Sequence, residues 1–203
     1  MSDDDDTDAH SSATGAAPTS YARFMRFGTL DFTTAIDSPG LLAAPTAAAL
    51  RAASAAASAD ALVAAIDPTL ADTAAFCAHY EIDPGDGANC VIVQARRGER
   101  TWYAACMVRG SDRLDVNGAV RRHLGARRLS FAPMDEAVEL SGMEYGGITP
   151  IGLPADWPLL IDESVAAHER LIIGSGIRGS KLLVTGSLLS ALPNAETLAI
   201  AIA

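Results

Sequence analysis

The spacing of hydrophobic and polar positions divides the chain into a helical front and a strand-rich remainder. Alanine dominates residues 41–66, and Pro45 stands where a first helical turn tolerates proline, so this pattern predicts one or two helices. Asp67-Pro68 interrupts the pattern. The run Thr69–Asp72 then has the character of a capping box, which predicts a further helix ending near Tyr80.

After a turn at Asp83–Gly87, the pattern becomes typical of β-structure. Apolar runs at 90–93 and 101–108 flank the polar stretch Arg96–Arg100, which predicts a hairpin with a five-residue loop. The later predicted elements are a helix over 116–124 between Asp115 and Gly125, a strand at 128–132, a helix at 133–141, strands at 159–161, 171–173 and 181–184, a helix at 187–192 and a closing strand at 197–202. Strands outnumber helices and mostly return on themselves, so we expect a mixed α+β fold around a largely antiparallel, partly closed, barrel-like sheet with flanking helices.

The length allows one core and an appendage. At 203 residues and 49% hydrophobic content, no second globular domain is needed. We expect a disordered acidic tail at 1–20, an alanine-rich helical N-terminal extension at 21–68 and the main domain at 69–203.

Several classes of protein are disfavoured by the composition. No apolar run approaches the roughly 18 to 20 residues that span a bilayer, and four aspartates stand where a signal peptide carries positive charge. We therefore expect a cytoplasmic protein without a membrane partner. Three cysteines without CxxC spacing predict no disulfide framework, and Cys77 and His79 lack a second ligand cluster, so we expect no metal and no cofactor.

The net charge of -10 is concentrated at the front of the chain. Residues 1–87 hold 13 acidic and 3 basic residues, whereas residues 88–203 hold 12 of each. Nine of those twelve basic residues fall between Arg96 and Arg128. A local basic face is therefore compatible with an acidic protein, since phosphate binding depends on the local field; the alternative is a set of scattered, solvated arginines.

The stretch from Tyr145 to Pro154 holds three glycines and two prolines in ten residues, so it encodes a loop of specified backbone shape. Almost no ionisable side chain is present, so chemistry in this loop would depend on its amides. The alternative is a tight turn between two core elements.

Residues 174–179 spell G-x-G-x-x-G after an apolar strand. A dinucleotide site would need a helix to follow, whereas Ser180–Val184 continues as a strand, so a nucleotide cofactor is not predicted. A hairpin turn without a ligand stays open as an alternative. No nucleophile elbow or zinc signature occurs. Asp162-Glu163 is a carboxylate pair at the end of a strand, and Asp162 either contacts a substrate or tethers a neighbouring loop.

Taken together, Gly146–Pro150, Leu160–Glu163 and Ile173–Gly179 resemble the YbaK/EbsC family of aminoacyl-tRNA editing proteins, which is related to the editing insertion of bacterial prolyl-tRNA synthetases. The resemblance covers about residues 70–200 and implies the same fold. It implies a site in which Gly146, Gly147, Asn89 and Asp162 act in catalysis. The implied substrate-binding residues are Thr149, Pro150, Gly152, Ser175 and Gly176, and the implied tRNA-binding residues are Arg121, Arg122, Arg127 and Arg128.

One position departs from the family pattern. Many members carry a lysine just before the first hairpin strand, and Asn89 stands there in this chain, whose one lysine is Lys181. Asparagine donates hydrogen bonds but carries no charge, so it can orient a ribose or a carbonyl but cannot neutralise a phosphate.

The sequence therefore predicts a trans-acting deacylase that hydrolyses the ester of a mischarged tRNA, with tRNA of the proline type as the first choice. Such an ester needs positioning, amide donors and a water rather than a strong nucleophile. Aminoacyl-tRNA is the expected partner and prolyl-tRNA synthetase a second candidate. The alternatives are a non-catalytic tRNA- or synthetase-binding module and a small-molecule binding protein. The sequence does not give the oligomeric state.

Overall fold

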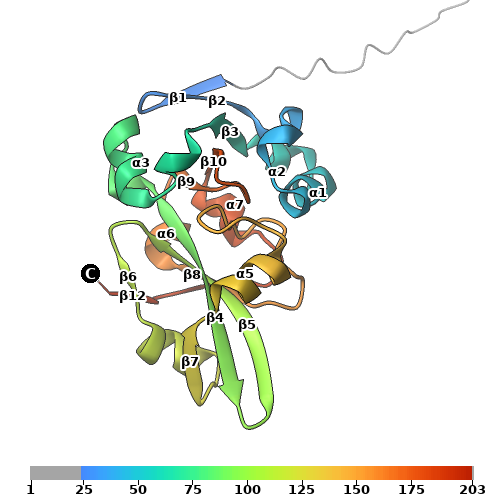
Figure 1. Ribbon diagram of the computed structural model, residues 1–203, viewed down its shortest axis with the longest axis vertical. Helices are drawn as coiled ribbons and strands as arrows, with labels where there is room; N and C mark the ends of the chain where they lie inside the picture. Colours follow the sequence, from blue (N-terminus) through green and yellow to red (C-terminus); the bar gives the residue numbers. More distant parts are fainter. Residues whose placement is uncertain (1–23, 203) are drawn as a thin grey trace, which may run out of the picture.

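The computed structural model describes residues 24–202, so the tail predicted at 1–20 lies outside the described residues. Two five-stranded sheets and a two-stranded ribbon form the framework (Figure 1). The first sheet is antiparallel, and its order is β1 (Phe24–Phe27), β2 (Leu30–Thr34), β3 (Leu62–Ala65), β10 (Ser180–Val184) and β9 (Leu171–Gly174).

The second sheet is mixed. Its order is β11 (Ala195–Leu198), β8 (Leu159–Asp162), β5 (Arg100–Arg109), β4 (Ala88–Arg97) and β7 (Arg128–Phe131). Strand β8 runs parallel to both of its neighbours, and the other pairs are antiparallel. The β4–β5 hairpin projects away from the first sheet (Figure 1), and its turn is Gly98-Glu99 rather than the five residues predicted. The ribbon pairs β6 (Arg113–Leu114) with β12 (Ala201–Ile202).

Seven helices surround the sheets within residues 24–202. They are α1 (Ala44–Ala52), α2 (Ala55–Ala59), α3 (Thr73–Tyr80), α4 (Arg121–His123), α5 (Met134–Ser141), α6 (Glu163–Ala166) and α7 (Gly186–Ser190). A π-helical turn, Val116–Val120, leads into α4, and short 3-10 turns lie at 35–37, 39–41, 68–70 and 84–86. No helix among these is long and apolar enough to cross a bilayer.

Two of the predicted caps, Asp115 and Gly142, are formed as the sequence indicated, whereas α3 is capped by Asp72 rather than by Thr69. The Asp115 carboxylate accepts hydrogen bonds from the amides of Gly118 and Ala119, which are otherwise unpaired at a helix start. Gly142 ends α5 with φ of 65°, a left-handed conformation that glycine adopts without strain.

The prediction of an α+β fold is confirmed, but the expected barrel-like closure is absent from the described residues. The two five-stranded sheets meet at a bridge between Gly87 and Ile172, and each sheet retains two outer strands that do not pair with each other. The sheets therefore form an open junction around the start of β4 and β9.

The N-terminal region is not the purely helical extension that its alanine content suggested. Helices α1 and α2 are present, but β3 lies between β2 and β10 in the first sheet, with Val63 paired to Leu182. Short apolar runs such as Leu62–Ala65 are ambiguous between helix and strand, because burial on both faces removes the alternating pattern. The domain boundary after residue 68 stays a prediction.

Candidate active site

A cavity of about 540 Å³ lies where the two sheets meet. Its walls come from the start of α3, the first half of β4, the end of β9, one residue of β10 and the loop after α5. The lining includes five residues with polar or charged side chains and one glycine of the loop: Asp72, Thr73, Asn89, Arg178, Lys181 and Gly146. Two of the residues predicted for the site, Asn89 and Gly146, are therefore brought together from strands and loops more than 50 positions apart in the sequence.

The loop after α5 contains amides that are paired within the protein and amides that are not. The Gly147 amide donates to the Glu144 carbonyl at 3.0 Å, and the Thr149 amide lies 3.4 Å from the Met143 sulfur. The amides of Gly146 and Ile148 make no hydrogen bond within residues 24–202, and both residues line the cavity. Of the two glycines predicted to act in catalysis, Gly146 thus keeps an unpaired amide beside the cavity and Gly147 does not, and Ile148 supplies a second unpaired amide.

Gly147 has a structural role instead. Its carbonyl accepts from the Gly176 amide at 2.7 Å, and a Cβ at Gly147 would lie 2.6 Å from the Ile177 backbone. A Cβ at Gly174 would lie 2.2 Å from the Gly147 carbonyl oxygen. The glycine-rich turn after β9 therefore packs backbone against backbone on the loop and fixes its shape.

Asn89 is half-buried on β4, and its amide orientation is set by a neighbour. The Thr73 hydroxyl, at the start of α3, donates to Oδ1 of Asn89 at 3.1 Å. This bond leaves the Nδ2 group as a donor without a partner in the described part of the chain. Asn89 can therefore donate to a ribose or carbonyl oxygen in the cavity.

Lys181 extends from β10 into the same cavity and is only 9% exposed. Its Nζ donates to the Ala71 carbonyl at 3.2 Å and lies 5.3 Å from the centre of the Phe76 ring. No ion pair joins Lys181 to a carboxylate in residues 24–202. Burial lowers the pKa of Lys181, and the nearby Arg178 adds to that effect.

A buried ammonium without a carboxylate partner is costly to keep, because desolvation is not repaid by an ion pair. A second cation, Arg178, lines the cavity and is fixed by two backbone carbonyls, Tyr145 at 3.2 Å and Pro68 at 3.1 Å. Among the described residues, the cavity wall holds one carboxylate, that of Asp72, which accepts a hydrogen bond from the Ala74 amide as the N-cap of α3. The cavity thus presents net positive charge suited to an anionic group.

Cys90 also lines the cavity, but it is not a nucleophile at neutral pH. Burial raises the pKa of its thiol, and the neighbouring Cys106 raises it further. Since the thiolate is the reactive form, Cys90 stays protonated and inert. Among residues 24–202, no three histidine, cysteine, aspartate or glutamate side chains are grouped as a metal site would require.

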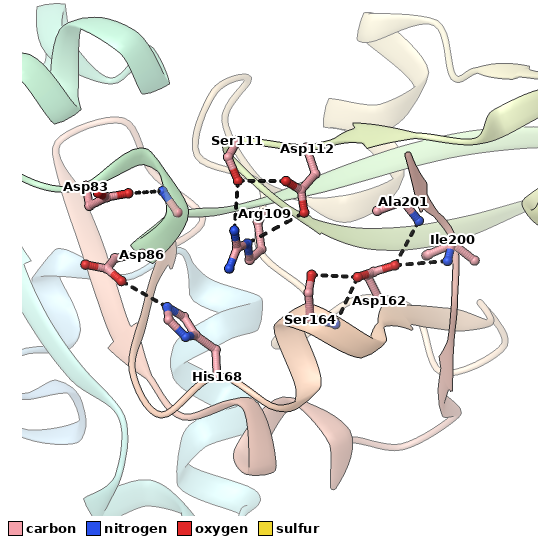
Figure 2. A network of polar contacts seen from close by, with 11 residues as sticks. Asp83, Asp86, Arg109, Ser111, Asp112, Asp162, Ser164, His168, Ile200 and Ala201 are labelled. Atoms are coloured by element: carbon pink, nitrogen blue, oxygen red, sulfur yellow. Dashed lines mark hydrogen bonds and ion pairs between the residues drawn. The ribbon is translucent and has the colours of Figure 1, made fainter. Parts of the chain in front are cut away.

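Asp162 does not line this cavity, and both of its oxygens serve the fold (Figure 2). Oδ1 accepts from the amide and hydroxyl of Ser164 at 2.9 and 2.6 Å, which caps α6. Oδ2 accepts from the amides of Ile200 and Ala201 at 2.9 and 2.8 Å. Burial by itself would raise the pKa of Asp162, but these hydrogen bonds outweigh it and the pKa is lowered. The tethering role that the sequence left open is the one the structure shows.

Figure 2 also shows separate polar contacts in the neighbouring loops. His168 Nε2 lies 3.0 Å from Oδ1 of Asp86, and Arg109 contacts Ser111 and Asp112 at 3.3 and 3.6 Å. These contacts lie apart from the cavity walls and hold the ends of β5 and α6.

The remaining predicted substrate residues are not in the cavity. Pro150 and Gly152 line a second, more apolar cavity of about 620 Å³ between α1, α7 and the loop before β8. Thr149 and Ser175 are fully buried, and the Ser175 hydroxyl lies 2.7 Å from that of Ser180. Gly176 has φ of 91° and packs against Ala43. These residues pack within or against the loop and do not line the first cavity.

The four arginines predicted to bind tRNA are exposed. Arg121 and Arg122 lie on α4, and Arg127 and Arg128 lead into β7 beside the projecting hairpin. Arg128 is paired with Arg96 of β4 in the ladder. None of the four forms an ion pair within residues 24–202, so their charges are available to a polyanion.

Sequence reasoning missed Lys181 and Arg178 as members of the site. Lys181 had one signal, since it is the single lysine in the chain and lies in an otherwise apolar strand. Charged residues are almost never buried without a reason, so a lysine inside a predicted core strand points to a functional position.

The family comparison covers most of this architecture. The profile of the aminoacyl-tRNA editing domain matches residues 67–191. No curated protein matches the chain. Among solved structures, a protein described as a proposed trans-editing enzyme for prolyl-tRNA synthetase is similar with a TM-score of 0.64 and 20% identity, over 79% of this chain and 99% of that chain. A scaffold protein from work on computational epitope grafting is similar with a TM-score of 0.67 and 20% identity, over 82% of this chain and 99% of that chain. At these identities the solved structures establish the fold. Residues 67–191 include every residue that lines the first cavity. The match over this range shows that the chain belongs to the aminoacyl-tRNA editing domain family.

Proposed function

We propose that the protein is a trans-acting deacylase that hydrolyses the ester bond of mischarged tRNA. The observation that carries this proposal is the convergence of two unpaired loop amides, Gly146 and Ile148, with Asn89 and Lys181 on one cavity. The substrate ester joins an amino acid to the terminal ribose of a tRNA. A site that cleaves it must hold a carbonyl, a ribose and a flanking phosphate, which are the groups that these donors and cations suit.

Candidate donors exist for the addition step of the reaction. Water adds to the ester carbonyl carbon, and the carbonyl oxygen becomes an oxyanion to which the Gly146 and Ile148 amides donate. The bond from the carbonyl carbon to the ribose oxygen then breaks, and the proton released by the water ends on that oxygen. The products are a free amino acid and an uncharged tRNA.

Lys181 supplies the positive charge of the site. In a buried cavity its ammonium acts through a lower dielectric than in water, so it stabilises nearby negative charge more strongly. Asn89 donates from Nδ2 to a substrate oxygen, with its orientation set by Thr73. Neither group needs to act as a nucleophile, because an aminoacyl ester is already activated.

The first substrate to test is tRNA of the proline type. We place the enzyme in the cytoplasm, and prolyl-tRNA synthetase is a candidate partner. Support comes from the fold shared with the proposed trans-editing enzyme. The exposed arginines Arg121, Arg122, Arg127 and Arg128 are assigned to the acceptor stem.

The test is a deacylation assay with a panel of mischarged and correctly charged tRNAs, compared with the rate of spontaneous hydrolysis. We expect accelerated release from at least one mischarged tRNA and none from its correctly charged counterpart. Release from none of the panel would reject the enzyme. Binding of uncharged tRNA across a salt series, measured in parallel, would then identify a non-catalytic tRNA-binding module.

A further inference from the structure

Large apolar side chains gather at the mouth of the cavity. Within residues 24–202, seven large hydrophobic side chains are exposed, and three of them line this one cavity: Phe131 at 64%, Tyr145 at 57% and Met134 at 52%. A single exposed hydrophobic residue is ordinary, whereas a cluster around a cavity marks a binding surface. Because these side chains line the cavity yet remain mostly exposed, they form its rim.

The two rings are held on fixed backbone. Phe131 ends β7 and is paired with Val93 of β4, and the next amide, Ala132, donates to the Ile92 carbonyl at 2.9 Å. The Tyr145 carbonyl accepts from the guanidinium of Arg178 at 3.2 Å. Neither ring stacks on another aromatic ring in the described chain. Both rings are therefore more than half exposed on backbone that is held by hydrogen bonds.

The surroundings of the rim indicate what would cover it. Inside lie the donors and cations of the cavity, and outside lie the exposed arginines of β7 and the hairpin. Arg128 and Phe131 are three residues apart on β7, so their side chains leave opposite faces of the strand. A ligand that enters across the rim would meet the aromatic side chains first and then the amide donors and cations of the cavity.

We propose that Phe131 and Tyr145 form a stacking platform for the unpaired nucleotides at the 3′ end of the tRNA. This assignment rests on the proposed function, because it places the end of the substrate at the same cavity. Nucleobases have flat π-faces that stack on aromatic side chains without sequence preference, and their phosphates favour adjacent cations. An unpaired strand can reach over such a rim, whereas a duplex is too wide to enter a cavity of this size.

The test uses an RNA minihelix with 2-aminopurine as its terminal base and an amide in place of the aminoacyl ester, so that it cannot be hydrolysed. Stacking on an aromatic ring quenches the fluorescence of 2-aminopurine. The variants are Phe131→Ala, Tyr145→Ala and Tyr145→Phe, with Phe24→Ala as the matched control. Phe24 is 67% exposed on β1 and lines none of the cavities described above.

We expect the wild-type protein to quench the probe and each alanine variant at the rim to bind it roughly 5- to 150-fold more weakly, the range for losing one stacked base. Tyr145→Phe and Phe24→Ala should retain wild-type affinity and quenching. All five proteins should unfold at similar temperatures, because the substituted side chains are exposed.

The outcomes separate this inference from the proposed function, since hydrolysis of mischarged tRNA is measured on the same proteins. If the wild type hydrolyses the substrate and both alanine variants bind and quench like it, the platform is wrong and the deacylase stands. If the wild type quenches the probe through these rings without hydrolysing any substrate, the platform stands and the deacylase is wrong. If the alanine variants lose binding to prolyl-tRNA synthetase but not to RNA, the rim is a protein contact and the platform is wrong.

Discussion

A methyl group added to Gly146 would lie 2.6 Å from Nη1 of Arg178, the atom that donates to the Tyr145 carbonyl. Gly146 also has φ of 81°, which residues with a Cβ rarely adopt. The conformation of this loop and the position of Arg178 therefore depend on one another.

Gly146→Ala should lower deacylation by about 10² to 10³-fold, the usual effect of losing one aligned oxyanion donor. The strained φ should also cost about 1 to 2 kcal/mol of stability. Gly98→Ala is the matched control, because Gly98 has φ of 63° in the hairpin turn and open space around it. The control should lose similar stability in thermal unfolding but keep its rate. Equal rates for wild type and Gly146→Ala would mean that this loop only shapes the fold.

Lys181→Met should abolish most of the activity while leaving the fold intact. The change removes a hydrogen bond to the Ala71 carbonyl, worth about 1 kcal/mol, but it also removes an unpaired buried charge. The free energy of unfolding at neutral pH should therefore change by about 1 kcal/mol or less. A variant that unfolds much more easily would show that Lys181 is kept for stability.

The pH dependence of Lys181 has a defined sign. Its pKa is lowered in the folded protein, so between the folded pKa and the unfolded value of 10.5 the unfolded chain binds the extra proton. Wild-type stability relative to Lys181→Met should rise with pH through that window. Enzymatic rate, corrected for spontaneous ester hydrolysis, should fall over the lower part of it, because the ammonium loses its charge. A rate that does not depend on Lys181 ionisation would contradict the electrostatic role.

Moving the positive charge from position 181 to position 89 by mutation gives a stricter test. Asn89 and Lys181 line the same cavity from β4 and β10. Asn89→Lys should therefore restore part of the deacylation rate that Lys181→Met removes when the two changes are combined. The matched combination with Asn89→Met should show no recovery. Identical rates for both combinations would show that the cavity needs more than a positive charge.

Asp162→Asn should lower the free energy of unfolding by about 2 to 3 kcal/mol, because an amide cannot accept all four hydrogen bonds from Ser164, Ile200 and Ala201. The lowered pKa of Asp162 adds stability above its unfolded value of 3.8, and this contribution is lost as pH falls through the folded pKa. The difference between wild type and variant should thus narrow in acid. Activity per folded molecule should be unchanged, and a specific loss of rate would return Asp162 to the site.

Arg121→Glu combined with Arg122→Glu should weaken tRNA binding and reduce its salt dependence, by roughly one unit of slope for each phosphate that the protein no longer neutralises. Arg51→Glu on α1 is the control, since Arg51 is also exposed but lies on the N-terminal region. Filter binding across a salt series measures both quantities. A slope equal to that of the wild type would move the RNA surface away from α4.

The ends of helices could be predicted from the sequence where one residue type is strongly preferred at the cap. Asp115 and Gly142 are recognisable as caps because helix ends need a carboxylate acceptor or a left-handed residue. Strand β3 was missed, since a buried strand of four small apolar residues has no alternation to distinguish it from a helix. Asp162 shows a different limit: its type and position suit a substrate contact or a tether, and only the arrival of Ile200 from the end of the chain decides between them. Lys181 could be placed in a strand, but no spacing reveals which cavity a single side chain enters.

Strand β3 also affects which fragment of this protein could be transferred to another protein. Residues 67–191 carry the family profile, yet β10 is paired along four residues with β3, and β8 is paired along four residues with β11. A fragment limited to the matched region would present two bare strand edges, which favour association with other chains. Grafting this domain onto another protein would thus call for transferring at least residues 24–202, with Leu62–Ala65 treated as an integral part of the transplanted sheet.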